Sequence, residues 1–385
     1  MPTPSFFLAT DRSPIDDTHP LWNQPLPTSR SGHATAETVT DEANLVSYGD
    51  YFFAVVRFCS HAGWKRVLLA AADKMEPPPT VESIGDVSIF LEKHGAFYHP
   101  ARIEMVVGGQ RLSLVVNVAI SRIGKRVLLQ ETKALEHLGE ARPFGWFPTV
   151  YATEKEPVAM YLGDWFEGFH EFHLTRRNGG REPGLVIWDG AAVPHLLSEH
   201  HTMALYRNMA MILTACYDPF STCQIFPWHH AAGDFVVRLE AEKTAVRLIT
   251  VRNYAPLIES SAGIAGENEI LEALLLFFLH LSVRMRLDRL DGVSEVVWAL
   301  DTCLAPTIDG FFQGLDLTAR MSGLPKIFPE IFNGYVRAKG DEALRAMAIH
   351  LVETVFDRRS EEHQVIKTHL ESHLSSIIHL MSNRA

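Results

Sequence analysis

The sequence predicts an α+β protein in which strands and helices are segregated along the chain. Apolar residues alternate with polar ones between Val87 and Ile120, and a period of two is typical of strands with one buried face. Beyond residue 197, apolar residues recur at spacings of three and four, which predicts amphipathic helices. With 385 residues, of which 47% are hydrophobic and 21% charged, the chain is long enough for two or three domains.

The first 80 residues are predicted to form an N-terminal segment of their own. Residues 1–40 are rich in Pro, Ser, Thr and Asp and show little periodicity, so we expect an extended surface arm, partly without structure. Three apolar runs then predict short helices: Ala43–Val46, Tyr51–Val56 and Val67–Ala72. Consecutive prolines at positions 77–79 break the chain.

Residues 81–168 are predicted to form a small lobe that begins with an antiparallel meander. Val87–Leu91 and Ile103–Val107 mark two strands separated by a turn at Lys93–Gly95. Gly108–Gly109 supplies the next turn, and Leu112–Ile120 marks the third strand.

One helix and two strands are expected to complete this lobe. Leu128, Leu135 and Leu138 fall at helical spacing directly behind the third strand. The runs Trp146–Ala152 and Val158–Phe166 then read as strands. The predicted order is therefore strand, strand, strand, helix, strand, strand.

Residues 169–385 are predicted to be mainly helical. Five helices are expected: Leu197–Cys216, Glu267–Leu287, Pro325–Lys339, Asp341–Phe356 and Ser360–Ser382. A polar loop and hairpin at 225–253 are the expected interruption, where two histidines and an aspartate precede the apolar run that starts at Phe235. Loops of this kind carry chemistry.

Composition excludes several classes of protein. A formal net charge of -11 disfavours nucleic-acid or anionic-membrane partners, because these require a basic face. The most apolar run, Ile270–Val283, is shorter than the roughly 20 residues that a membrane span needs and contains His280. Four scattered cysteines suggest neither a zinc knuckle nor a disulfide framework, and the N-terminus lacks the pattern of a secretory signal. We therefore expect a cytoplasmic protein.

Three common catalytic loops are missing from the sequence. There is no Gly-x-x-x-x-Gly-Lys-Ser/Thr P-loop, no Gly-x-Gly-x-x-Gly dinucleotide turn and no Gly-x-Ser-x-Gly nucleophile elbow.

The predicted small lobe, followed by a helical lobe with a polar loop and hairpin, resembles the bilobal protein-kinase-like fold. Within that fold, the aminoglycoside and choline phosphotransferase group is the most similar in texture, over roughly Asp86 to Asn253. The resemblance implies a five-stranded antiparallel N-lobe with one inserted helix and a mainly helical C-lobe. It also implies ATP with Mg²⁺ as cofactor if activity is retained, and otherwise no cofactor.

In such kinases the first turn covers the ATP phosphates, and a lysine on the third strand pairs with a helix glutamate. Here the turn contains Lys93 and Gly95, and the third strand offers Asn117 or Ser121, both uncharged. Glu131 matches the helix glutamate without its lysine, although Lys93 would be able to replace that lysine from the turn.

The segment Met160–Gly168 resembles the fifth strand and hinge of small-molecule kinases. Asp164 and Glu167 lie in it, and the resemblance implies that adenine would lie against this segment.

The catalytic loop of the group overlays on the stretch from Pro227, at the histidine position, to Asp234, at the metal-binding asparagine. This register puts His229 at the catalytic aspartate and Thr250 at the second metal-binding aspartate. The loss of these charged groups should lower phosphoryl transfer by orders of magnitude, since each contributes about 10²-fold or more.

The preferred interpretation is a degenerate kinase-like protein that binds a nucleotide, metabolite or partner in the interlobe cleft without ordinary phosphotransfer. One alternative is an active small-molecule phosphotransferase in which His229 is the base and Asp234 the metal ligand, with His230 as a further catalytic candidate. Another is a protein interaction module with a protein partner or a second copy of the chain. The candidate cofactor-binding residues are Lys93, Gly95, Asn117, Glu131, Asp164, Glu167 and Thr250.

Plainer interpretations of the same residues stay open. His229 and His230 would equally suit hydrogen-bonded structural roles beside Trp228, and Asp234 an Asx turn. His170 and His173, three residues apart, would suit a metal ion only on a helix and with a third ligand.

Overall fold

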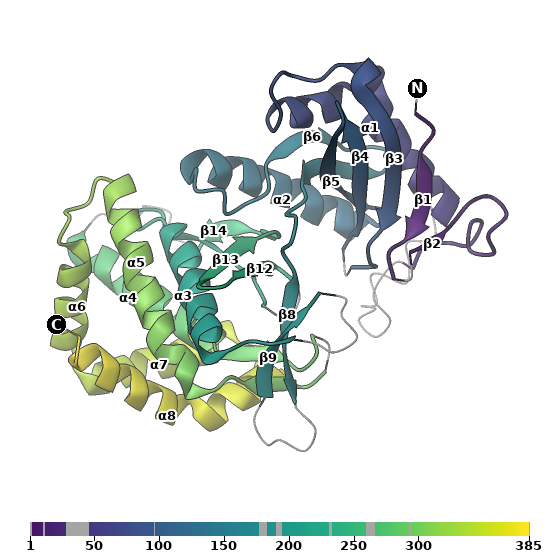
Figure 1. Ribbon diagram of the computed structural model, residues 1–385. Helices are drawn as coiled ribbons and strands as arrows, with labels where there is room; N and C mark the ends of the chain where they lie inside the picture. Colours follow the sequence, from purple (N-terminus) through teal and green to yellow (C-terminus); the bar gives the residue numbers. More distant parts are fainter. Residues whose placement is uncertain are drawn as a thin grey trace. The chain divides into compact units, whose positions relative to one another are not determined.

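The computed structural model describes residues 2–10, 12–27, 46–95, 97–176, 183–189, 195–230, 233–258, 266–292 and 294–384. These residues form eight α-helices and several sheets (Figure 1), which confirms the predicted α+β class. The chain divides after Glu167 into two compact units, one residue before the expected lobe boundary. The segment 1–80 belongs to the first unit together with the sheet and is not a separate part.

The first unit is built on one sheet with the strand order β2-β1-β3-β4-β5-β7-β6. Strands β3 (Ile84–Leu91), β4 (His99–Val107) and β5 (Gln110–Ala119) form the predicted antiparallel meander. Helix α2 (Arg122–Ala141) follows β5, and the hairpin of β6 (Val150–Glu154) and β7 (Ala159–Asp164) joins the sheet through β7. The predicted order of strands and helix in this segment is confirmed.

The N-terminal residues correct the prediction of a surface arm. Strand β1 (Ser5–Leu8) pairs in parallel with β3, and β2 (Ser13–Pro14) pairs with β1, so the sheet has seven strands where five were expected. Trp22 and Leu26 are buried in the core of this unit. The paired stretches are too short to create an alternating pattern, so their structure is decided by packing against residues far along the chain.

Helix α1 (Tyr48–Ala72) replaces the separate short helices expected in this region. Residues 61–64 inside it have non-helical backbone angles, so two helical parts remain, and they contain the predicted runs Tyr51–Val56 and Val67–Ala72. Its start is fixed by Ser47, whose Oγ accepts a hydrogen bond from the Asp50 amide at 3.1 Å. The helix predicted at Ala43–Val46 lies outside the described residues except for Val46, which is not helical.

The two helices of the first unit cover different faces of its sheet. Residues of α1 share one apolar core with Ile89 of β3, Ile103 of β4 and Val116 of β5. Because successive strand residues point to opposite faces, Asn117 points away from this core. Helix α2 packs against β5, β6 and β7, and its Glu131 faces Tyr161, the strand neighbour of Asn117.

The second unit is mainly helical, as predicted. The five expected helices are present with shifted ends: α3 (Glu199–Ala215), α4 (Glu267–Arg284), α6 (Phe328–Lys339), α7 (Asp341–Val355) and α8 (Glu361–Ser382). Helix α5 (Leu304–Met321) was not predicted, because Pro306, Gly310 and Gly314 lower its apparent helix propensity. These two glycines allow close packing on α3: a Cβ added at Gly310 would lie 2.0 Å from the carbonyl oxygen of Arg207.

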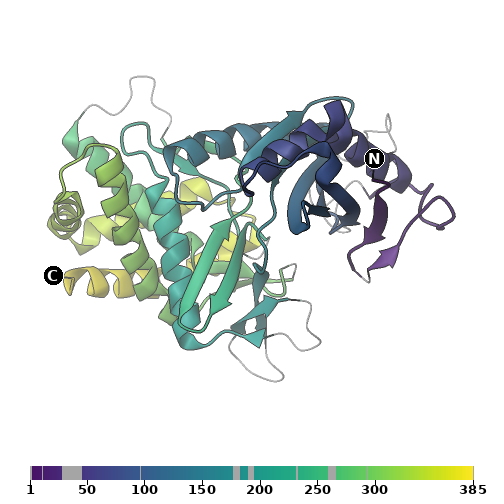
Figure 2. The ribbon, with the colours of Figure 1, turned by 45° about the horizontal axis from the view of Figure 1, so that its top comes forward.

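The expectation that one hairpin alone interrupts these helices was wrong. The hairpin itself is present, as β12 (Phe235–Glu240) paired with β13 (Lys243–Leu248), and it lies against α3 (Figure 2). Other strands were missed because each is only two to six residues long: β8 (Glu171–Arg176), β9 (Pro183–Trp188), β10 (His195–Leu196), β11 (Cys223–Ile225), β14 (Tyr254–Pro256), β15 (Leu287–Arg289) and β16 (Val296–Trp298).

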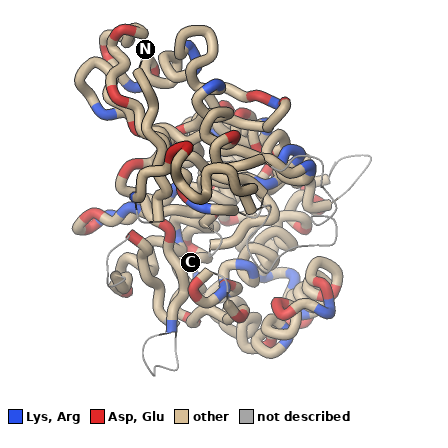
Figure 3. The backbone as a smooth tube through the Cα atoms, turned by 90° about the vertical axis from the view of Figure 1, so that its right-hand side faces the viewer, with Lys and Arg blue, Asp and Glu red and all other residues tan. Residues whose placement is uncertain are grey.

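Charge and hydropathy in the structure follow the composition. Acidic and basic positions are interspersed along the backbone in the view of Figure 3. Within the described residues, every helix is too short or too polar to cross a membrane. Helix α4 is apolar on nearly all sides, which is typical of a helix surrounded by other elements. Its Leu274, Leu275 and Phe278 are fully buried.

Candidate functional site

The polar loop of the second unit connects β11 to β12 and ends in a turn that only glycine fits. Gly233 has a φ of +70°, in the left-handed region that favours glycine. A Cβ at this position would also lie 2.5 Å from Oε1 of Glu171 on β8. The turn delivers Asp234 directly before the first residue of β12.

Asp234 is a buried carboxylate that is already fully engaged. Its side chain is 1% exposed, and the two terminal nitrogens of Arg252 donate to its two oxygens at 2.5 and 2.7 Å. Oδ2 also accepts the backbone N–H of His229 at 2.8 Å. A bidentate guanidinium is a strong and geometrically specific partner for a carboxylate, so Asp234 both closes the loop and holds Arg252.

Arg252 reaches Asp234 because of the hairpin. It lies four residues beyond the end of β13, and the amide of Ile249 donates to the Asp234 carbonyl at 2.7 Å, which ties the two ends of the hairpin together. Thr250, expected to stand for a metal-binding aspartate, lies between them and is half-buried. The cation beside Asp234 is thus supplied by the protein itself.

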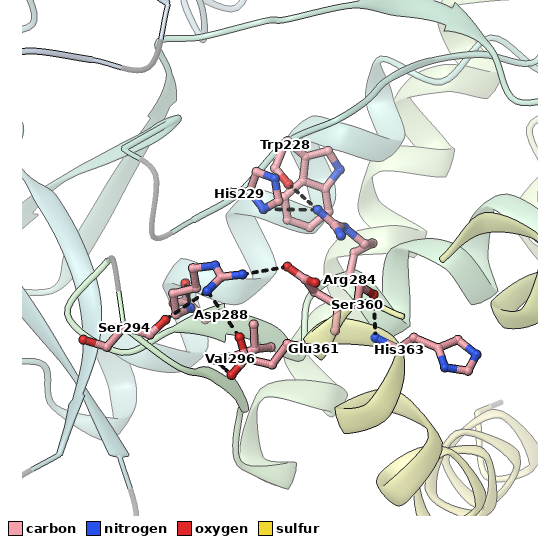
Figure 4. Close-up of polar contacts among 11 residues, drawn as sticks. Trp228, His229, Arg284, Asp288, Ser294, Val296, Ser360, Glu361 and His363 are labelled. Carbon is pink, nitrogen blue, oxygen red and sulfur yellow. Dashed lines mark hydrogen bonds and ion pairs between the residues drawn. The ribbon is translucent and has the colours of Figure 1, made fainter. Parts of the chain in front are cut away.

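His229 lies on the outer side of the loop with its proton placement fixed by an arginine. Nη2 of Arg284 is 3.2 Å from its Nδ1 and also donates to the Trp228 carbonyl at 3.0 Å (Figure 4). Because arginine has only donors, Nδ1 must accept, so a neutral His229 carries its proton on Nε2. The residue as a whole is exposed, while the protein groups around its ring remove part of the ring's hydration. This desolvation and the charges of Arg284 and Arg252 lower the pKa of His229 to about 3.

His230 points the other way, into the interior. It is 1% exposed, and its Nδ1 lies 3.5 Å from Oδ2 of Asp288. The rings of Tyr206 and Trp228 also lie beside it. These contacts bury the ring among protein groups, which suits the structural interpretation of this histidine better than contact with a substrate.

In the first unit, the structure brings Asn117 and Glu131 together around a tyrosine. Nδ2 of Asn117 donates to the Tyr161 hydroxyl at 2.6 Å, and all three residues are buried. Burial and the nearby charge of Glu131 raise the pKa of Tyr161 well above its usual value, against the effect of the Asn117 hydrogen bond. A neutral amide and a phenol thus occupy the strand positions near Glu131, where the kinase resemblance implies an ammonium.

The turn after β3 is held by its own backbone. The amide of Gly95 donates to the Tyr98 carbonyl at 3.1 Å, and a Cβ on Gly95 would lie 2.6 Å from that oxygen. Lys93 is half-buried. The adjacent His94 contacts the Tyr48 hydroxyl and His99, so this part of the turn is tied to α1 and β4.

Asp164 is engaged in structural contacts at the end of β7. Burial alone would raise the pKa of its carboxyl, but Lys74 at 2.5 Å, the Thr149 amide and the Tyr151 hydroxyl together lower it. These partners link β7 to β6 and to the segment that directly follows α1. Glu167 is exposed.

A metal centre finds no support within the described part of the chain, where no group of three or more His, Cys, Asp or Glu side chains could hold an ion. The prediction that His170 and His173 would pair on a helix is wrong. His173 is buried on strand β8, and His170 directly precedes this strand and forms a β-bridge with Val237. In extended backbone, residues three apart point to opposite faces.

Two arginines were missed by the sequence reasoning. Arg252 lies two residues after Thr250, which was singled out, and Arg284 directly follows the most apolar run of the chain. A charge at the end of so apolar a helix was a signal that the residue would be buried and need polar partners. The predicted residues that the loop does bring together are His229 and Asp234.

Comparison with known proteins adds no relatives. The chain matches no protein-family model, and no curated protein is detectably similar to it in sequence.

Proposed function

We propose that this chain is a kinase-like protein that binds a nucleotide, metabolite or protein partner without ordinary phosphotransfer. The order β3-β4-β5-β7-β6, with α2 inserted after β5, supports the kinase-like part. So does the polar loop that leads into the hairpin of β12 and β13 in the second unit.

The observation that carries the proposal is the pairing of Asp234 with Arg252. Phosphoryl transfer in kinases depends on divalent metal that bridges the phosphates and neutralises their charge. Asp234 stands at the position of a metal-binding residue in the resemblance, and both of its oxygens accept hydrogen bonds from Arg252. A metal ion would have to displace a bidentate, largely buried guanidinium, so metal-dependent catalysis is disfavoured.

The state of His229 argues against the active phosphotransferase alternative. A general base must accept a proton from the attacking hydroxyl. Nδ1 of His229 accepts from Arg284, and Nε2 then carries the proton. Asn117 likewise offers no positive charge to phosphate oxygens.

One observation favours the interaction module as a second candidate function. Ile327 is 61% exposed and Ile331 39% exposed, one helical turn apart at the start of α6, while Phe328 and Phe332, which directly follow them, are buried. Exposed apolar residues of this kind suit a protein partner or a second copy of the chain.

A thermal-shift titration with ATP, ADP and GTP, in Mg²⁺, Mn²⁺ or EDTA, tests the proposal. We expect a nucleotide to stabilise the protein equally with and without metal, by about 2.7 kcal/mol at a hundredfold excess over Kd. Stabilisation that requires metal, together with transfer of phosphate to an acceptor, would favour the active enzyme. If no nucleotide has any effect, the interaction module becomes the better explanation.

A further inference from the structure

Arg284 is a buried arginine that no carboxylate neutralises directly. It is 7% exposed, at the last turn of α4. Two acidic residues act on its charge, Glu362 and Asp234, but each is paired with another arginine: Glu362 with Arg289 at 3.1 Å and Asp234 with Arg252 at 2.5 Å. Within the described residues, Arg284 itself forms no ion pair.

Structural contacts account for the burial of Arg284 but not for its charge. Its guanidinium lies near the rings of Phe226, Trp228 and Phe356, at 5.5 to 6.0 Å from their centres. The C-terminus of α4 also favours a cation. Both effects are weaker than an ion pair, and Nε is buried with no acceptor among the described residues. A buried donor without a partner costs about 1–3 kcal/mol, so the guanidinium is held here without full compensation of its charge and donors.

The loop provides a second donor next to this guanidinium. Nη2 of Arg284 fixes His229 with its proton on Nε2, and His229 is exposed. Nε2–H is therefore the ring donor that this exposed residue can offer to a ligand. The other ring nitrogen contacts a positive charge that has no ion-pair partner among the described residues. The two groups lie on opposite edges of the ring, with Arg284 at Nδ1 and the N–H at Nε2. An oxyanion bound at Nε2–H would therefore be stabilised by the charge of Arg284 through the imidazole, without touching the guanidinium.

We propose that His229 and Arg284 form an oxyanion site that binds a carboxylate or phosphate group of a small molecule without metal. This inference rests on the proposed function and deepens it by naming the ligand chemistry. His229 Nε2–H donates to the ligand, and the Arg284 guanidinium supplies the positive charge.

The test is a calorimetric titration of the full chain in EDTA at constant ionic strength, with inorganic phosphate and succinate as probes and chloride as the baseline. His229→Leu removes the Nε2 donor, whereas His229→Gln keeps an N–H at a similar position. His229 is exposed, so both variants should fold, and circular dichroism checks this. Arg320→Ala, at a surface arginine of α5 paired with Asp316, removes a positive charge elsewhere and controls for unspecific anion binding.

We expect at least one probe to bind, about tenfold or more weaker to His229→Leu, and within about threefold of wild type to His229→Gln and Arg320→Ala. Nitrogen-15 NMR of the imidazole should show the Nε2–H form of His229, and Arg284→Lys should change that signal. Phosphate binding without succinate binding would assign the site to phosphorylated ligands, and the reverse to carboxylates.

The inference is overturned if neither probe binds, or if His229→Leu binds as tightly as wild type. Nucleotides that bind while both free anions fail would overturn this site and leave the proposed function intact. Anions that bind while every nucleotide fails would support the site and remove the nucleotide form of the proposed function.

Discussion

Replacing Arg252 by alanine should destabilise the second unit strongly. The change leaves Asp234, which is 1% exposed, as a buried carboxylate without its cation. Breaking a buried ion pair from one side costs about 3–5 kcal/mol. Asp234 retains the His229 amide at 2.8 Å, and the Arg252 side chain is 18% exposed, so we expect the lower end, about 3 kcal/mol. That loss corresponds to a fall of about 6–12 °C in Tm for a unit of this size.

Urea denaturation followed by tryptophan fluorescence measures this change, with Trp228 close to the pair as a reporter. The matched control is Arg320→Ala, which removes an exposed pair and should cost about 0.5 kcal/mol or less. The double variant Asp234→Ala/Arg252→Ala should recover part of the loss, because no charge is left buried. A cost below about 1 kcal/mol for Arg252→Ala, equal to that of the control, would refute the role assigned to Arg252.

Three further outcomes follow from other contacts. Burial and the charge of Arg284 lower the pKa of His280 to about 3, so the stabilising contribution of the neutral ring is full above pH 6.5 and is lost as the pH falls towards 3. His280→Leu should therefore remove about 1 kcal/mol of the stability that wild type loses between pH 6.5 and 5.5. If the variant keeps the pH dependence of wild type in urea melts, this expectation is wrong. A Cβ at Gly49 would lie 2.6 Å from Nε1 of Trp22, so Gly49→Ala should cost about 1–3 kcal/mol by overpacking; a neutral effect in thermal melts would mean that the N-terminal segment is not held there. Asn117→Ala removes the donor to the buried Tyr161 hydroxyl and should cost about 1–3 kcal/mol of stability. The double variant Asn117→Ala/Tyr161→Phe should cost less than the two single variants added together. Strict additivity in denaturant melts would count against the pairing.

Regular local patterns made much of the fold predictable. The alternation through Val87, Ile103 and Val116 predicted the meander because each strand buries one face, and the same residues lie in the core. Helix α5 was hidden because Gly310 and Gly314 weaken the local helix signal, although they are what allows it to approach α3. Strand β1 was hidden because four paired residues are too few to show a period.

The candidate site was predictable in position but not in chemistry. The turn at Gly233 and the placement of Asp234 before a strand follow from the local sequence. The cation that pairs with Asp234 is Arg252, which the hairpin places beside it although it lies 18 residues further along the chain. The ring nitrogen of His229 that carries the proton is set by Arg284, at the end of helix α4. Contacts between residues far apart in sequence leave no local pattern that could reveal them.

Because β1 pairs in parallel with β3, its residues are synthesised well before their partner strand and find their place late. The meander can form from neighbouring hairpins, but Ser5 pairs with Ser88, and all of α1 lies between them. Such non-local contacts form slowly because a long loop must close first. Until β3 has been made, the rings of Phe6 and Trp22, which stack on Phe52 in the finished unit, lack their sheet. During translation this segment is therefore transiently exposed apolar chain, of the kind that makes folding intermediates prone to aggregation.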